Sequence, residues 1–196
     1  MNEIVQLKIV LDGSNPPIWR QVLVSNQITF FELHHIIQIA MGWQNYHAFQ
    51  FRCMEQEIGD TKNDFYDEED SPLLEVRETK LNQFELQPEL VIDYIYDFGD
   101  GWEHTLVVEA LLPCNPKSSY PTCIAGEMRC PLEDSGGLYG YYETLDIFAN
   151  PKHPEYEDVV EWIGNKRFDP KKFDPKKVNK ELKQLAMYIR SWDMWR

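Results

Sequence analysis

The sequence contains no long hydrophobic run. No stretch approaches the roughly 18 consecutive apolar residues that a helix needs to cross a bilayer. No basic segment followed by an apolar core stands near the first residue, as it would in a secretory signal. We therefore expect a soluble, cytoplasmic protein with no membrane partner. Cysteines in that compartment are usually thiols or ligands rather than disulfides, and the chain has four, Cys53, Cys114, Cys123 and Cys130.

Positive charge is also scarce. The chain has 19 Lys and Arg against 33 Asp and Glu, which gives a formal net charge of −14. A phosphate backbone repels such a chain, which argues against nucleic acid as a general partner. The charge is uneven, because Lys166–Lys183 holds eight basic and three acidic residues whereas 55–89 holds three basic and twelve acidic residues. Solvated surface explains both runs, and a basic C-terminal face that docks an acidic partner is the alternative.

Named catalytic and metal-binding motifs are missing as well. The sequence has no P-loop, no G-x-S-x-G, no H-E-x-x-H and no dinucleotide fingerprint, so we expect no cofactor. Six residues separate Cys123 from Cys130, which is wider than the C-x2-4-C pairs of structural zinc sites. A zinc site would have to borrow a ligand such as His104. A pair of buried, reduced cysteines is the simpler interpretation.

The sequence does contain a series of strand patterns. Apolar and polar residues alternate in five segments, which predicts strands at 4–11, 18–24, 46–53, 91–98 and 103–112. Residues 60–71 and 113–131 lack periodicity and are expected to be loops. The order shows no regular exchange of strand and helix, and no Gly/Ser-rich linker divides the chain. It therefore predicts one domain over 1–196 with an α+β fold, in which a mostly antiparallel sheet packs against helices.

Helix signals occur once in the first third of the chain and repeatedly in the last third. Thr29 and Glu32 form a capping box that opens a helix, and Gly42 ends it. We expect His34 and His35 on the exposed side of this helix. Further helices are expected at 137–148, at 154–164 and from Asp174-Pro175 onward, the last with an apolar stripe through Val178, Leu182, Leu185, Ile189 and Trp192.

The stretch Tyr96–Val108, YDFGDGWEHTLVV, is the densest group of polar side chains between two strands. A two-residue turn at Asp100-Gly101 would place Asp97 directly opposite His104. A carboxylate beside an imidazole orients the ring and raises the histidine pKa. The pair is then either a structural contact that fixes the hairpin, or a general base or metal ligand with its orienting carboxylate. In a longer turn the two side chains never meet.

A second polar group precedes the helix expected at 137–148. Ser135-Gly136-Gly137 would present free amides to an anion, but Glu133 and Asp134 stand beside them. Acids at a helix start repel an anion and satisfy the amides themselves, so we expect helix capping here. The candidate catalytic residues are Asp97, His104, Glu133 and Asp134, and the candidate metal ligands are Cys123, Cys130 and His104.

These segments together resemble the Ri-plasmid open-reading-frame-three-like family, whose members are also described as passenger proteins of insertion elements. The match is close to an archaeal structural-genomics member of that family. The resemblance implies an α+β fold, a prokaryotic origin near mobile elements and no established reaction. It rests on PPIWRQVLV (16–24), LHHIIQIAMGWQNYHAF (33–49), YDFGDGWEHTLVVE (96–109), CIAGEMRCPLEDSGGLYGY (123–141), HPEYEDVVEWIG (153–164) and FDPKKFDPKKVNKEL (168–182).

Three hypotheses on function follow. The first is a non-enzymatic interaction module with an unidentified protein partner, because the chain is acidic, aromatic-rich and without a known catalytic constellation. The second is an enzyme or metal-dependent protein of unassigned chemistry that uses an Asp97/His104 cluster. The third is a DNA-associated protein that binds through Lys166–Lys183.

Overall fold

The computed structural model describes residues 3–61 and 73–193. Eight strands form one sheet in the order β5-β4-β3-β6-β7-β1-β2-β8. Neighbouring strands are antiparallel except β4 and β5, which are parallel. The α+β fold with a mostly antiparallel sheet is therefore confirmed. The strands are β1 (Glu3–Leu11), β2 (Ile18–Ser25), β3 (Phe49–Cys53), β4 (Gln56–Gly59), β5 (Leu74–Glu75), β6 (Val91–Tyr96), β7 (Trp102–Pro113) and β8 (Thr122–Glu127).

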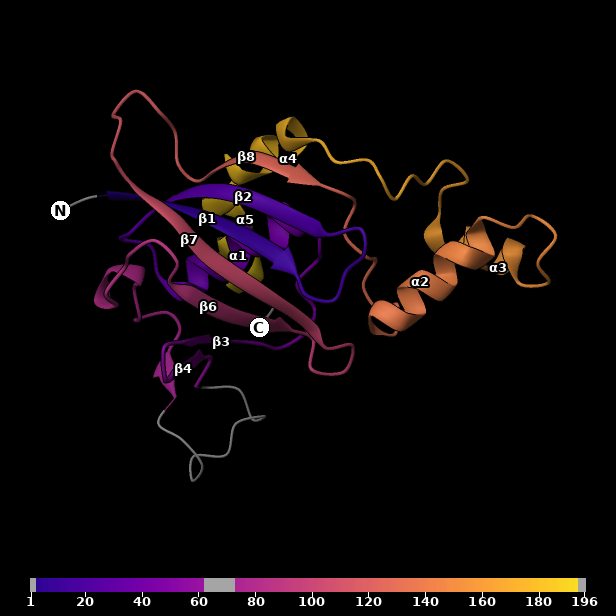
Figure 1. Ribbon diagram of the computed structural model, residues 1–196, viewed down its shortest axis with the longest axis horizontal. Coiled ribbons are helices and arrows are strands. Elements are labelled where there is room, and N and C mark those ends of the chain that lie inside the picture. Colours follow the sequence, from indigo (N-terminus) through magenta and orange to yellow (C-terminus); the bar gives the residue numbers. More distant parts are fainter. Residues whose placement is uncertain (1–2, 62–72, 194–196) are drawn as a thin grey trace.

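Helices cover one face of the sheet and extend the molecule to one side (Figure 1). Behind the strands in this view lie α1 (Phe30–Met41), α4 (Pro175–Leu182) and α5 (Leu185–Asp193), and both C-terminal helices contact α1. The pair α2 (Gly137–Phe148) and α3 (Tyr156–Ile163) projects beyond the sheet as an arm. A short 3-10 turn, Leu81–Gln83, precedes β6. None of the described helices lies over the opposite face of the sheet, which is turned toward the viewer.

The capping box sets the start of α1 as expected. The Thr29 hydroxyl accepts a hydrogen bond from the Glu32 amide at 3.1 Å, and the Glu32 carboxylate accepts one from the Thr29 amide at 2.8 Å. Gly42 ends the helix in the left-handed conformation, at φ 94°. The expectation for His34 and His35 was wrong, since both are fully buried. His34 faces the sheet, where its ring stacks on Phe49 and hydrogen-bonds to the Tyr94 hydroxyl. His35 lies against Tyr188 of α5, because α1 is packed between the sheet and a second helical layer.

Two other expectations need correction. Within the expected loop 113–131, Thr122–Glu127 forms strand β8 and pairs with β2. The segment has little alternation of its own, so its strand conformation comes from pairing with the free edge of β2. The expected final helix is two helices, because α4 ends at Leu182 and α5 begins at Leu185. Residues 62–71 of the expected acidic loop, and the Trp192 side chain, lie outside the part that is described.

The edge strand β8 is closed by a side chain from α4. Asn179 accepts a hydrogen bond from the Cys123 amide at 2.7 Å and donates one to the Cys123 carbonyl at 2.8 Å. Its amide group thus makes the two bonds that a neighbouring strand would make. Asp174 holds α4 in this position by capping it, since its carboxylate accepts from the Lys176 amide at 2.9 Å. No helix within 3–61 and 73–193 is long and apolar enough to cross a membrane.

Candidate functional site

The hairpin between β6 and β7 turns earlier than expected. Tyr96 pairs with Trp102 and Tyr94 pairs with His104, so Asp97 lies in the turn and does not face His104. The Asp97 backbone adopts a left-handed conformation, with φ 58°, and its Oδ1 accepts from the amides of Gly99 at 2.9 Å and Asp100 at 3.3 Å. This side-chain turn ends the strand at Tyr96. The backbone reverses as expected, but the predicted Asp97–His104 pair is wrong and the longer turn is the correct alternative.

His104 belongs to the core. It is 1% exposed and lies edge-on to the Trp43 ring, with ring centroids 5.2 Å apart. Neither ring nitrogen makes a hydrogen bond of good geometry, although backbone groups of Trp102 and Tyr94 lie close to the ring. Burial lowers the pKa of His104 to about 3, because it outweighs these backbone contacts, which raise the pKa. The imidazole is therefore neutral at pH 7, and His104 packs as an aromatic side chain rather than as a partner of Asp97.

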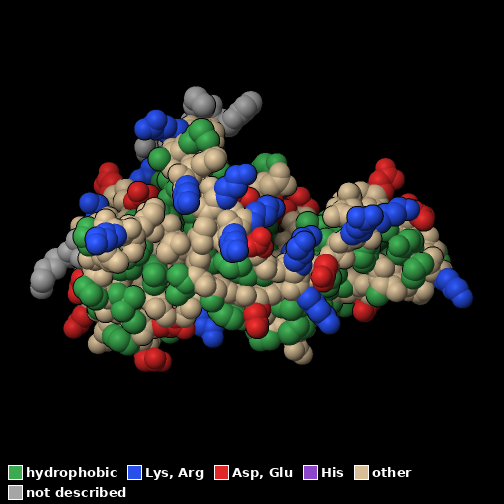
Figure 2. All heavy atoms as spheres, turned by 90° about the horizontal axis from the view of Figure 1, so that it is seen from above, with side chains coloured by type: hydrophobic (Ala, Val, Ile, Leu, Met, Phe, Trp, Pro, Cys, Tyr) green, Lys and Arg blue, Asp and Glu red, His purple; other side chains and the backbone are tan. Residues whose placement is uncertain are grey.

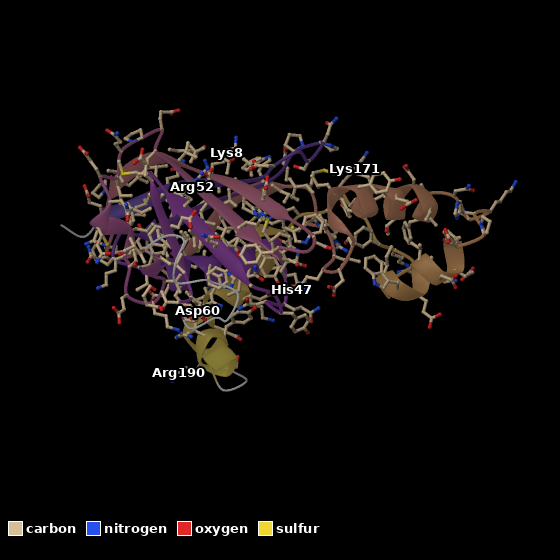
Figure 3. The ribbon with its side chains drawn as sticks, turned by 90° about the horizontal axis from the view of Figure 1, so that it is seen from below. Lys8, His47, Arg52, Asp60, Lys171 and Arg190 are labelled. Atoms are coloured by element: carbon tan, nitrogen blue, oxygen red, sulfur yellow. The ribbon has the colours of Figure 1, made fainter. Side chains whose placement is uncertain are left out.

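Asp97 meets a different histidine. The Nε2 atom of His47 lies 3.5 Å from Asp97 Oδ2 and 3.2 Å from Asp134 Oδ1. The three ligand atoms all lie within 4.8 Å of one another. We call these three residues the His47 cluster. Figure 3 shows His47 on the side of the sheet body that faces the α2–α3 arm.

Strand pairing explains why the sequence pattern missed His47. The alternating pattern of residues 46–53 predicted a strand that included His47, and it gave this histidine no functional role. In the structure β3 pairs with β6 so that Phe49 faces Tyr96, and the Asp97 amide donates to the Ala48 carbonyl at 2.9 Å. His47 precedes one strand and Asp97 follows its partner, so the two side chains meet at the same end of the sheet. No local spacing could show this, because the residues are far apart in the sequence.

The acids before α2 do not cap that helix, contrary to expectation. The N-cap of α2 is Gly136, which has no side-chain cap. Instead Asp100 of the hairpin accepts a hydrogen bond from the Gly136 amide at 3.1 Å. Glu133 accepts hydrogen bonds from the Tyr96 hydroxyl and from the Gln44 amide, the latter at 2.9 Å. Asp100 thus binds the amide of the N-cap residue itself, while Glu133 and Asp134 contact residues at the end of the sheet.

The contacts of these acids hold three loops together. Gly137 approaches the hairpin so closely that an added Cβ would lie 2.7 Å from the Asp100 carbonyl oxygen. Burial raises the pKa of Tyr96, and its hydrogen bond to Glu133 raises it further. The Tyr96 hydroxyl is therefore a donor to the Glu133 carboxylate over the whole physiological range. The site is built from segments 44–47, 97–101 and 133–137.

The geometry of the His47 cluster suits a divalent cation. Ligand atoms that are each about 2.1 Å from a metal ion lie about 3.0–3.4 Å apart in octahedral or tetrahedral arrangements. The measured 3.2 and 3.5 Å separations from His47 Nε2 fall near that range. Side-chain exposure rises from 11% at Asp97 through 29% at His47 to 69% at Asp134. The cluster thus has a buried side and an open side.

The cysteines take no part in this cluster. Cys123 and Cys130 are free and buried, and burial raises the pKa of Cys130 to about 12. Across 3–61 and 73–193, the His47 cluster is the one group of three or more His, Cys, Asp or Glu ligand atoms that converges. The structure therefore does not bring Cys123, Cys130 and His104 together as metal ligands.

The basic run Lys166–Lys183 spans the segment before α4 and α4 itself. Figure 2 looks down from the side of α4 and β8, where Lys and Arg side chains stand among Asp and Glu side chains. The face shown has mixed charge rather than a continuous basic stripe. DNA binding through this run stays a prediction.

Fold and site together define an α+β protein whose mostly antiparallel sheet carries a His–Asp–Asp cluster at one end of its strands. The chain belongs to the family of plasmid pRiA4b ORF-3-like proteins, whose model matches residues 3–177. It is 34% identical over 185 residues to the uncharacterized protein y4hQ of Sinorhizobium fredii. This alignment covers 93% of this chain and 92% of the relative.

A solved relative shows the same fold. The crystal structure of the protein of unknown function MM3350 from Methanosarcina mazei Go1 matches with a TM-score of 0.80 and 35% identity, over 90% of this chain and 97% of that one. The family and the archaeal neighbour agree with the resemblance seen in the sequence. None of these descriptions names a reaction, so an argument about function depends on the geometry of the site.

Proposed function

We propose that this protein binds a divalent metal ion at His47, Asp97 and Asp134 and acts as a metal-dependent protein. One observation carries the proposal: an imidazole nitrogen and two carboxylate oxygens from three separate segments lie within 4.8 Å of one another. It is the metal-dependent hypothesis from the sequence in corrected form, with His47 in place of His104.

The ligand set indicates which ions fit. One nitrogen and two oxygen ligands suit Zn²⁺, Mn²⁺ or Fe²⁺ better than ions that prefer thiolates. Three protein ligands leave positions open, as in catalytic rather than structural sites. Asp134 also lines a cavity of about 340 Å³ between α2 and α3 that contains Asp158 and Trp162. A bound ion would stand at the edge of this cavity, where water or a substrate oxygen can reach it.

Backbone conformation supports the assignment. Asp97 and Asp134 both have φ 58°, a left-handed conformation that is uncommon for residues other than glycine. Such conformations cost free energy and tend to persist at functional sites. Both carboxylates therefore project from turns, and Asp97 uses its Oδ1 to close its own turn while its Oδ2 faces His47.

Calorimetric titration with Mn²⁺ and Zn²⁺ after chelator treatment tests the proposal. We expect one equivalent of ion to bind and to raise the unfolding temperature. The variants His47→Gln and Asp134→Asn should each weaken binding by about tenfold or more, since each removes a ligand. Asp146→Asn is the matched control, because Asp146 is an exposed acid on α2 outside the cluster. Equal binding by all four proteins, or none by the wild type, would refute the site.

A second candidate function is the non-enzymatic interaction module. Exposed aromatic residues stand beside the same loops: Tyr46 is 66% exposed, Phe98 is 44% exposed and Tyr139 is 80% exposed. Tyr46 adjoins His47, Phe98 adjoins Asp97, and Tyr139 lies in the first turn of α2. Aromatic side chains are enriched where proteins bind one another. This corner would then engage an unidentified protein partner.

Cross-linking in a native host extract tests the second candidate. The wild-type chain should give a specific protein product, and the double variant Tyr46→Ser/Phe98→Ser should lose it. Val91→Ser is the control, since Val91 is 44% exposed at the start of β6, at the opposite end of that strand from Tyr96. A product that persists in the double variant, or no product above background, would exclude this surface. Neither result depends on metal, so the two candidates are tested separately.

A further inference from the structure

Arg20 is a buried arginine on the core face of β2, where its neighbours in the alternation are apolar. It is 1% exposed. Its Nε donates to the Ala40 carbonyl at 2.8 Å, and its Nη1 donates to the carbonyls of Trp19 and Glu127, both at 2.8 Å. The structure records no hydrogen bond from Nη2. Three of the five donor hydrogens are thus satisfied by backbone, and the two on Nη2 remain.

Within residues 3–61 and 73–193, no ion pair joins Arg20 to a carboxylate. The titratable groups whose charge acts on Arg20 are the thiols of Cys130 and Cys123. Burial raises the pKa of both thiols, that of Cys130 to about 12, so both are neutral at pH 7. Buried charges in proteins are ordinarily paired with an opposite charge. The buried guanidinium of Arg20 therefore has no negatively charged partner among these groups.

Arg20 lines a cavity of about 510 Å³ between β2, the end of α1 and the start of α4. Nη2 is not among the enclosed polar atoms that lack a partner, so this nitrogen opens on the cavity. Lys172 and Lys177 also line it, and Met41 and Trp43 contribute apolar wall. The volume is that of a typical small-molecule site.

The acids around the cavity are engaged elsewhere or exposed. The Asp174 carboxylate caps α4 through the Lys176 amide. Glu133 accepts from the Gln44 amide and the Tyr96 hydroxyl. Glu181 is exposed on α4. Four basic side chains line the cavity, since Arg129 joins Arg20, Lys172 and Lys177, against three acids that do not pair with Arg20. This excess of positive charge stands out in a chain whose net charge is −14.

Phe173 fixes the orientation of the guanidinium group. Its ring lies over Arg20, with the guanidinium carbon 4.0 Å from the ring centroid. Gly126 makes room for it, because a Cβ at that position would lie 2.5 Å from Phe173 Cε1 and 2.8 Å from the Trp19 carbonyl oxygen. One face of the guanidinium is thus covered, and its edge remains for a ligand. The duplicated FDPKK sequence supplies Lys172, Phe173 and Lys177 to this arrangement.

From these observations we propose that the cavity binds a small organic anion, whose carboxylate or phosphate group pairs with Arg20 and whose apolar body packs on Met41 and Trp43. Lys172 and Lys177 would hold further oxygens of the anion at the entrance. The cavity does not include the His47 cluster, so the proposal goes beyond the metal site and does not depend on it.

Calorimetric titration of the full chain, freed of metal by chelator treatment and then dialysed to remove the chelator, tests the proposal with phenyl phosphate and benzoate as probes. Saturable binding is expected for at least one of them, and not for benzyl alcohol, which lacks the charge. The double variant Lys172→Gln/Lys177→Gln should weaken binding by about tenfold or more. Lys171→Gln is the matched control, because Lys171 adjoins Lys172 but faces a different cavity.

The variant Arg20→Met should abolish binding of both probes if it folds, and the lysine variants decide the matter if it does not. Absence of saturable binding by the wild type would overturn the proposal. So would equal affinity in the double variant and in Lys171→Gln. Equal affinity for inorganic phosphate and phenyl phosphate would overturn the assignment of an organic ligand.

Discussion

The fully buried imidazole of His104 should make the stability of this protein depend on pH. The pKa of His104 is about 3 in the folded chain because burial disfavours the charged ring, whereas the unfolded chain has an ordinary histidine pKa of about 6.5. The unfolded state therefore binds a proton more readily than the folded state. Stability from this residue is fully present above about pH 6.5 and is lost as the pH falls toward 3.

The size of the effect follows from the shift. Each pH unit between the two pKa values changes the free energy of unfolding by about 1.4 kcal/mol. Between pH 7.5 and pH 4.5 the contribution of His104 falls by about 2.5 kcal/mol. His104→Leu removes the titrating group while keeping an apolar side chain in the core. The variant should therefore lose less stability than the wild type over the same interval, by about that amount.

Urea unfolding at a series of pH values, in buffer with a chelator, measures the difference. The comparison between wild type and His104→Leu cancels the titration of the other histidines and of the carboxylates. Parallel curves for the two proteins would show that His104 is not held neutral by burial. The burial effect would also be refuted if the free energy of unfolding fell more steeply with decreasing pH in His104→Leu than in the wild type.

We make three further predictions, two on the free energy of unfolding and one on the reactivity of the thiols. Thr29→Ala should lower the free energy of unfolding by about 1 kcal/mol in urea titrations, because the helix loses its N-terminal cap, while Thr29→Ser should retain most of it. Gly137→Ala should cost about 1–2 kcal/mol from the left-handed conformation alone, and more because the Cβ would meet the Asp100 carbonyl oxygen at 2.7 Å; an unchanged midpoint would contradict this close approach. In native protein at pH 7, iodoacetamide should modify the exposed Cys114 and spare the buried Cys130, whose pKa is raised to about 12; mass spectrometry that finds both modified equally would disprove it.

The elements that local sequence determines were predictable. The Thr29–Glu32 capping box and the Asp174 cap act within a few residues of themselves, and each defines a helix start in the structure as it does in the sequence. Strand β8 was missed because its conformation depends on the edge of β2. The burial of His34 and His35 was missed because the residues that cover them, Phe49 and Tyr94 of the sheet for His34 and Tyr188 of α5 for His35, come later in the chain.

The candidate site was predictable only in part. Asp97, Glu133 and Asp134 were chosen for their residue type and position beside glycine-rich turns, and they do meet at one end of the sheet. His104 was chosen by assuming a two-residue turn, and the side-chain turn of Asp97 shifts the register away from that pairing. His47 could be found only from the pairing of β3 with β6.

The contact of Asn179 with Cys123 also bears on how the protein stays separate from its own copies. An unpaired sheet edge invites another chain to add a strand, and here an amide side chain from α4 occupies the backbone positions at which such addition would start. Helix α4 therefore protects the β8 edge from pairing with another chain, in addition to packing against the core. A chain shortened before Pro175 would present β8 as a bare edge, and we expect it to self-associate during purification.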